Sequence, residues 1–126
     1  MITATIGRDH YRTEIIASGK TLWGDEPEEL GGTDVAPAPG EFLMVALASC
    51  TAITLRMYAD RKQWPVEQIR VEVGFEKIET KTIFKRDVAL YGDLSEEQQQ
   101  RLLQIANSCP VHKTLMHPIE IITQLI

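Results

Sequence analysis

The sequence predicts an α+β fold in which antiparallel sheets surround one long buried helix. Residues 41–62 indicate the helix, because their apolar side chains recur at three- and four-residue spacing. Short runs rich in β-branched residues indicate strands on both sides of it, in the order strands, helix, strands, helix, strand. A chain of 126 residues is large enough to bury a core and too small for two ordinary domains. We therefore expect a single domain over residues 1–126.

The N-terminal part is expected to form a small antiparallel meander. Residues 2–6 and 11–17 would pair as a hairpin across a polar turn, and a brief strand would follow at residues 21–23. From residue 24 to residue 40 the composition shifts to Asp, Glu, Gly and Pro, which indicates a loop of unusual length. Long loops in compact domains are often functional.

The central helix is expected to be enclosed by protein. Between Phe42 and Leu55 it carries no charge, so no broad polar face is available for solvent. The limited length of this uncharged stretch, and its polar ends, favour a core helix over a membrane span. One small meander is a poor cover for so large a helix. We therefore expect a homodimer in which two such helices share a core.

Two strands and a second helix are expected to follow. Residues 69–75 alternate in polarity, and residues 83–90 supply a partner strand. Ser95 and Gln98 have the spacing of a capping box, and the helix that they begin should end near Asn107.

The remaining segment is expected to contain a junction and one more strand. Residues 108–112 form the junction, and residues 119–126 are predicted as a terminal strand that begins after Pro118.

The charge pattern excludes some classes of partner. The formal net charge is −5 and Lys and Arg do not cluster, so nucleic acid is not expected as a partner. The N-terminus has no cationic start followed by an apolar block, and no apolar stretch is expected to span a bilayer, which favours a cytoplasmic protein without a membrane partner. In that reducing compartment the two cysteines are expected to serve packing, metal binding or redox chemistry rather than a structural disulfide.

Cys50 and Cys109 are the first candidates for chemistry. Cys50 lies in mid-helix, where a cysteine is often a small buried hydrophobe. Cys109 lies where a helix ends and a proline follows, so its side chain can face a cavity. A metal site made of Cys50, Cys109, His112 and His117 is an alternative, but the paired C-x-x-C spacing of structural zinc sites is absent.

A reactive thiol also needs a cation or a helix dipole, because only the thiolate attacks. Arg56 is six residues beyond Cys50, about 120° away around the helix. Arg8 lies in the polar turn of the first hairpin and is the better candidate on geometry. His10 lies in the same turn and is expected to be solvated.

Two motifs resemble one protein family. Residues 40–59 read GEFLMVALASCTAITLRMYA, and residues 106–115 read ANSCPVHKTL. Together with the Gly-Gly-Thr-Asp run that ends at Asp34, they resemble the two cysteine motifs of the OsmC/Ohr family of osmotically inducible and organic hydroperoxide resistance proteins. The Asp-Glu-Pro run that begins at Asp25 is closest to the OsmC-like branch.

The resemblance implies an intertwined homodimer with a thiol pair at the subunit interface. By analogy, Cys50 would be the peroxidatic thiol that attacks an organic hydroperoxide, or less well hydrogen peroxide, and Cys109 would be the resolving thiol. Arg8, in a turn that resembles the family's arginine turn, would stabilise the thiolate. A dithiol, of lipoyl type in part of the family, would reopen the disulfide. No nicotinamide, flavin or metal cofactor is implied.

One position departs from the family pattern. The catalytic glutamate of the family precedes the peroxidatic cysteine by ten residues, and this position is Gly40 here. Glu41 would lie on the opposite face of a continuous helix from Cys50. Asp34, or the Asp25 and Glu26 pair, is the other candidate for its replacement. Loss of the carboxylate supports the alternative of a non-catalytic protein that binds a small ligand or senses redox state.

The pocket beside Cys50 is expected to be apolar, which favours organic hydroperoxides over hydrogen peroxide. The residues expected to line or border it are Phe42, Met44, Leu47 and Met57.

Overall fold

The computed structural model describes all residues, 1–126, and shows an α+β chain. The chain divides into two compact units, Met1–Leu43 and Met44–Ile126, which are described separately. The predicted fold class, antiparallel sheets with one long helix, is confirmed.

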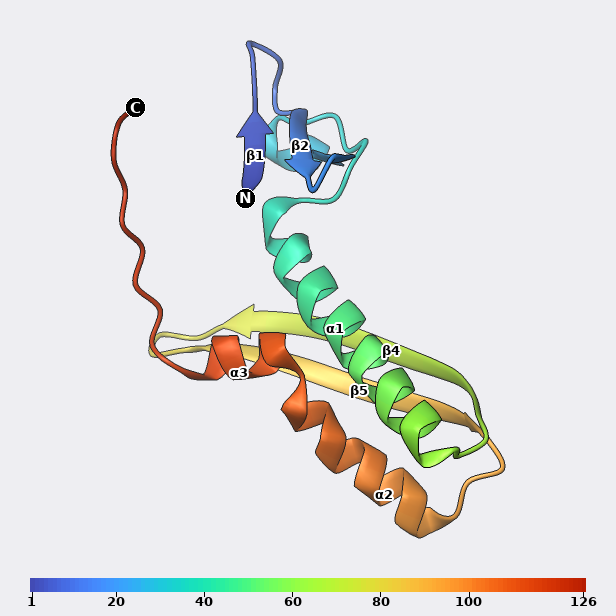
Figure 1. Cartoon of the computed structure of the whole chain (residues 1–126). Coiled ribbons are helices and arrows are strands. Elements are labelled where there is room, and N and C mark those ends of the chain that lie inside the picture. The colour runs from blue at the N-terminus through green and yellow to red at the C-terminus, as the bar shows by residue number, and fades with distance from the viewer. The chain divides into compact units, whose positions relative to one another are not determined.

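The first unit contains a three-stranded antiparallel sheet in the order β1-β2-β3 (Figure 1). Its strands are β1 (Ile2–Thr5), β2 (Thr13–Ala17) and β3 (Lys20–Gly24). Ser18 and Gly19 form the two-residue turn between β2 and β3, and both have positive φ, 51° and 76°. Two such residues in sequence match the right-handed twist of a hairpin. The predicted meander is therefore confirmed.

The long loop of the first unit is organised around one buried carboxylate. Asp25 is 2% exposed and accepts hydrogen bonds from the backbone N–H groups of Tyr11, Glu26, Thr33 and Val35. The Thr33 hydroxyl donates a further bond of 2.5 Å to Asp25 Oδ2. The short 3-10 helix η1 (Glu28–Leu30) lies within this loop. Together with backbone bonds such as those from the Asp34 N–H to the Glu26 carbonyl and from the Gly32 N–H to the Pro27 carbonyl, this side chain holds a loop without regular strands.

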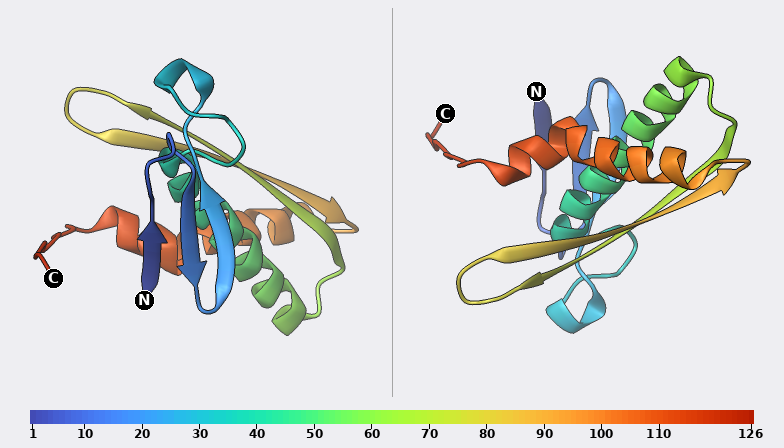
Figure 2. Two further views of the ribbon diagram at one scale, coloured as in Figure 1. Left: turned by 90° about the horizontal axis from the view of Figure 1, so that it is seen from above. Right: turned by 90° about the horizontal axis from the view of Figure 1, so that it is seen from below.

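The second unit packs two helices against a long hairpin. The helix α1 (Pro39–Lys62) starts in the first unit and supplies Leu55 and Ala59 to the core, and α2 (Glu96–Ile105) supplies Leu102. Figure 2 shows both helices beside the antiparallel hairpin of β4 (Val66–Lys77) and β5 (Thr82–Gly92). Both strands are longer than the sequence predicts.

The helix α2 begins as expected. The Ser95 side chain accepts a bond from the Gln98 N–H, and the Gln98 side chain accepts one from the Ser95 N–H, which completes the capping box. After α2 the chain continues through the 3-10 turn η2 (Ala106–Ser108) into α3 (Pro110–Met116). The segment expected to be an irregular junction is therefore mostly helical.

The predicted terminal strand is wrong for the isolated chain. Residues 119–126 form no regular structure, and Ile121, Ile122 and Leu125 are among their exposed apolar side chains. Figure 2 shows this segment continuing beyond α3. Its sequence favours a strand, but a strand requires the edge of another strand for its backbone hydrogen bonds, and none within the chain pairs with it.

The expectation that no segment could span a membrane is not met by the length and composition of α1. By length and composition alone, α1 is apolar enough to cross a bilayer, with a mean hydropathy of 1.6 over its most apolar stretch, of which 22% is buried within the chain. The core helix of a soluble protein meets the same criterion.

Candidate thiol site

The helix α1 positions Cys50 near its middle, at the border of the face that packs inward. Cys50 is half-buried, and its neighbour Thr51 is fully buried. Thr51 Oγ1 donates a hydrogen bond of 2.7 Å to the carbonyl of Leu47, one turn earlier. This bond satisfies the hydroxyl inside the apolar core.

Cys109 lies in the joint between η2 and α3 and is completely buried. It precedes Pro110, which occupies the first turn of α3, a position that tolerates the missing N–H of proline. Cys109 Sγ accepts a bond of 3.4 Å from the backbone N–H of His112. The sequence therefore places a thiol at the end of a helix where free N–H groups favour negative charge.

The two cysteines lie close enough for each to change the acidity of the other. Burial and the interaction with Cys109 raise the pKa of the Cys50 thiol, against the opposing effects of the Val111 backbone and Thr54. Burial also raises the pKa of Cys109, but bonds from Cys50, the His112 N–H, Thr51 and the Val111 N–H outweigh it and leave that pKa below its ordinary value. Cys109 is therefore the more acidic thiol of this pair.

Arg86 is the cation that joins the elements around the thiols, and sequence analysis missed it. Its Nη1 donates to Thr51 Oγ1 at 3.1 Å and to the Ala106 carbonyl at 3.2 Å, and its Nη2 donates to Asn107 Oδ1 at 3.0 Å. Arg86 thus connects β5 with the residue after Cys50 and with the turn before Cys109.

A signal for Arg86 was present in the sequence. The residues of β5 that alternate with it and are partly buried, namely Phe84, Val88 and Leu90, are apolar. A charge at an inward position of an alternating strand requires hydrogen-bonding partners.

His112 does not provide a second positive charge at neutral pH. Its burial, and then the nearby Arg86 guanidinium, lower its pKa. A neutral imidazole leaves Arg86 as the charged side chain closest to the network.

Arg8, the third predicted site residue, lies in the first unit. It is exposed, in the segment between β1 and β2. The structure brings Cys50 and Cys109 together, and the role of Arg8 stays a prediction.

Two of the carboxylates considered as replacements for the family glutamate, Glu41 and Asp25, have other partners. Glu41 Oε1 accepts a bond of 3.1 Å from the Ala38 N–H at the start of α1. Asp25 holds the loop through five different groups, and these bonds, led by the Thr33 hydroxyl, keep its pKa well below 3.8 despite its burial. Both carboxylates therefore act locally in the first unit.

An apolar pocket of about 310 Å³ lies beside the thiol segments. It is lined by Thr54, Met57, Tyr58, Arg61, Ile105, Ser108 and Pro110, so it borders the residues on both sides of Cys109, although neither cysteine lines it. Of the pocket residues expected from the sequence, only Met57 lines it. Leu47 is instead buried, and the Phe42 ring lies close to Gly24 in the first unit.

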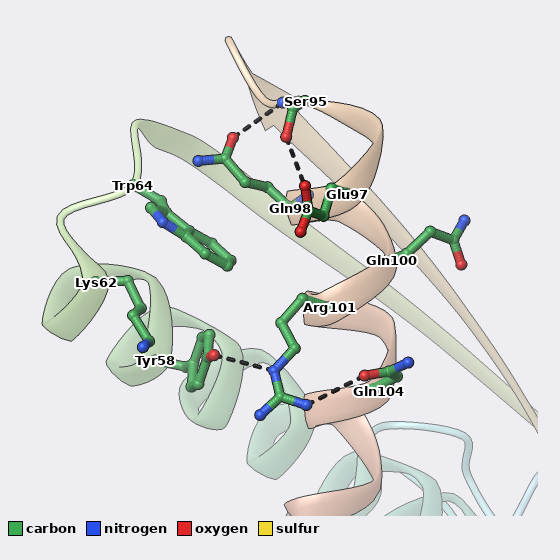
Figure 3. Close-up of a pocket in the computed structure, with 9 residues that line it drawn as sticks. All are labelled: Tyr58, Lys62, Trp64, Ser95, Glu97, Gln98, Gln100, Arg101 and Gln104. Carbon is green, nitrogen blue, oxygen red and sulfur yellow. Dashed lines mark hydrogen bonds between the residues drawn. The ribbon is translucent and has the colours of Figure 1, made fainter.

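A larger pocket of about 680 Å³ lies between the end of α1 and α2 (Figure 3). Arg101 Nε donates a bond of 3.1 Å to the Tyr58 hydroxyl, and Lys62 lies over the same ring. Neither cysteine lines this pocket. The Arg101–Tyr58 bond connects the two helices, and the other hydrogen bonds among these residues lie within α2 and its cap.

The alternative metal set is not assembled as ligands. His117 Nδ1 lies 3.1 Å from the Pro118 carbonyl, and no group of three or more His, Cys, Asp or Glu side chains is arranged to hold a metal ion.

Solved structures share this fold. A candidate osmotic stress induced and detoxification response protein from Psychrobacter arcticus has a TM-score of 0.77 at 23% identity, over 93% of this chain and 88% of that chain. An OsmC-like protein from Mycoplasma pneumoniae has a TM-score of 0.79 at 18% identity, over 91% and 85%. An organic hydroperoxide resistance protein OsmC from Legionella pneumophila has a TM-score of 0.61 at 24% identity, over 92% and 88%.

No curated protein matches the sequence at a significant level. The family match is direct, however, because residues 31–124 match the OsmC-like protein family, a range that includes both cysteines and Arg86. This chain belongs to the OsmC-like protein family.

Proposed function

We propose that this protein is a cytoplasmic thiol peroxidase that reduces organic hydroperoxides through Cys50 and Cys109 in oxidative-stress defence. The observation that carries the proposal is the pair itself: a half-buried thiol and a buried, more acidic thiol that affect each other's pKa. Family membership and the hydroperoxide resistance protein among the structural relatives support a stress-related redox role.

The proposed reaction has three balanced steps. The Cys50 thiolate attacks the terminal peroxide oxygen, the O–O bond breaks, and the alkoxide takes a proton and leaves as an alcohol. The Cys109 thiolate then attacks the Cys50 sulfenic acid, whose hydroxyl leaves as water, and a disulfide forms. A dithiol reductant, of which a lipoyl group is one form, reopens it by two exchanges and becomes a disulfide itself.

The apolar pocket beside the thiol segments supports an organic hydroperoxide as the substrate. Met57, Ile105 and Pro110 give it an apolar lining, so an organic group would bury apolar surface there that hydrogen peroxide lacks. Hydrogen peroxide should therefore be the poorer substrate.

A homodimer is part of the proposal. Val45, Ile53 and Met57 of α1 are each at least half exposed, although they belong to the most apolar helix of the chain. The exposed segment 119–126 adds unpaired backbone with strand-forming residues. Exposed apolar surface of this kind marks an interface, and a second copy would cover both features.

Arg8 is proposed to lower the pKa of Cys50. Burial and Cys109 raise the pKa of Cys50, so little thiolate forms at neutral pH unless a cation stabilises it. If Arg8 acts there, an Arg8→Ala variant should show a higher Cys50 pKa than the parent in a Cys109→Ser background. An unchanged Cys50 pKa would remove Arg8 from the site.

The raised pKa of Cys50 also favours a second candidate, a redox-sensing or small-ligand-binding protein on the same fold. Such a protein would react with peroxide at most once and would not turn over with a reductant.

The test is the consumption of cumene hydroperoxide by the reduced protein with excess dithiol. The wild type should consume many equivalents, and Cys50→Ser should lose this activity. The exposed neighbour offers a matched control, because Ser49 bonds only to its own helix carbonyls and Ser49→Ala should keep the activity. Equal, slow consumption by wild type and Cys50→Ser would reject the enzyme, and a single equivalent consumed would favour the sensor.

A further inference from the structure

Three elements meet at Arg86, and each contact leads to a cysteine-bearing segment. Thr51 follows Cys50 on α1, and Ala106 and Asn107 belong to the turn that ends at Cys109. Arg86 is partly buried, and the planar guanidinium supplies several donors in fixed directions. One side chain therefore fixes the spacing between the two thiol segments.

Thr51 connects this arginine to the sulfur of Cys109. The Thr51 hydroxyl has a single hydrogen, and its oxygen accepts a bond from Arg86. In this structure that hydrogen is donated to the Leu47 carbonyl, and the Cys109 thiolate, whose formation Thr51 favours, is the alternative acceptor. Accepting a bond from a cation polarises a hydroxyl and makes it a stronger donor.

We propose that Arg86 is a positioning residue for the thiol pair, which acts through Thr51 and the η2 turn to favour the thiolate of Cys109. The inference deepens the proposed function and rests on it only for the catalytic use of that thiolate. Cys50 from α1 and the His112 N–H from α3 act directly on the Cys109 thiol, whereas Arg86 from β5 bonds to Thr51 and to the Ala106 carbonyl. Because burial and Arg86 keep His112 neutral at neutral pH, Arg86 is the cation of this arrangement.

The consequence for the reaction concerns the reopening of the disulfide. When an external thiolate attacks one sulfur of a disulfide, the other sulfur leaves with the bonding electron pair, and the more acidic thiol leaves faster. A stabilised Cys109 thiolate directs the reductant to the Cys50 sulfur. The mixed disulfide then forms on the less buried cysteine, where a second reductant thiol can reach it.

The test measures the pKa of Cys109 by thiolate ultraviolet absorbance in a Cys50→Ser background, which keeps a hydroxyl donor at position 50. Arg86→Gln should raise this pKa by about one unit, a tenfold fall in the acid dissociation constant. It should also raise the pKa of His112, followed by NMR, because a positive charge has been removed. Arg86→Lys should give a smaller rise than Arg86→Gln, because lysine keeps the positive charge and can replace some of the hydrogen bonds.

Arg70→Gln is the matched control. Arg70 lies on the neighbouring strand β4, is exposed and pairs with Glu72. The Arg70→Gln substitution should leave the Cys109 pKa unchanged. An unchanged pKa in a folded Arg86→Gln variant would overturn the proposal.

Thr51 variants keep the test decisive if Arg86→Gln fails to fold. Thr51→Val keeps the shape but removes the hydroxyl and should raise the Cys109 pKa, and Thr51→Ser should restore it. Equal pKa values for these two variants would also overturn the proposal. None of these titrations uses peroxide, so a protein that fails to turn over peroxide but shows these shifts would lose only the proposed function.

Discussion

Cys109 Sγ accepts a hydrogen bond of 3.4 Å from the backbone N–H of His112, which caps the first turn of α3 with a sulfur atom. Serine, threonine, aspartate and asparagine usually occupy such a position. A thiolate there gains from the same N–H groups. This geometry distinguishes Cys109 from Cys50, which lies in the middle of its own helix, α1, and does not cap α3.

The first prediction concerns the site of thiol exchange. If the oxidised protein is treated with a limiting monothiol, quenched in acid and mapped by peptide mass spectrometry, the adduct should lie mainly on Cys50. The reason is that Cys109 is the better leaving group. In Arg86→Gln a larger share should move to Cys109. An adduct mainly on Cys109 of the wild type would contradict the assignment of the more acidic thiol.

The second prediction concerns Asp25 and pH. Its folded-state pKa lies below the ordinary 3.8, so its carboxylate stabilises the folded state at neutral pH. That contribution is present above the unfolded pKa and is lost as the pH falls from about 4 through the folded pKa. Asp25→Asn should lower the urea midpoint at neutral pH and flatten its decline in acid.

Asp87→Asn is the control for that experiment. Asp87 is an exposed carboxylate on β5. Its substitution should change the midpoint little, and the steep acid decline should persist. Equal acid profiles for the wild type and Asp25→Asn would show that this carboxylate does not hold the loop.

The third prediction concerns the core between α1 and α2. Leu102 is completely buried in the cluster with Leu55 and Ala59. Leu102→Ala should lower the free energy of unfolding by about 3 kcal/mol, because it removes apolar contact and leaves a cavity. The neighbouring Leu103 is 53% exposed, so Leu103→Ala should cost less than about 1 kcal/mol. Chemical denaturation measures both, and similar losses would contradict this packing.

The fourth prediction concerns the start of α2. Ser95→Ala removes the acceptor for the Gln98 N–H and should lower the free energy of unfolding by about 1 kcal/mol. Ser95→Asp keeps an acceptor and should retain most of it. An equal loss in both variants would argue against the capping box.

Local patterns were sufficient for much of the fold. The capping box at Ser95, the apolar spacing of α1 and the β-branched runs of the first sheet depend on residues close in sequence, and these predictions were confirmed. The α3 helix was missed because Pro110 and the short length of the element resemble a junction. Residues 119–126 have strand-forming side chains, but the formation of a strand depends on a partner edge rather than on propensity.

The site could be predicted only in part, because some of its contacts also depend on tertiary structure. The family pattern identified Cys50 and Cys109, and the structure brings them together. Arg86 is 35 positions from Thr51, so only tertiary structure reveals their contact. The expected pocket residues were chosen because they are close to Cys50 in sequence. The pocket is also lined by Ile105 and Pro110, which come after the β4–β5 hairpin in the chain.

The most direct measurement for the central claim, that Cys50 and Cys109 form one redox-active pair, is a free-thiol count after one equivalent of cumene hydroperoxide. The wild type should lose both thiols together and lose the mass of two hydrogen atoms, as a disulfide requires. The Cys109→Ser variant has no second thiol to resolve the sulfenic acid on Cys50. In this variant a sulfenic-acid reagent should therefore trap that sulfenic acid. Two thiols that both survive the peroxide, or that oxidise independently without a disulfide, would contradict the account.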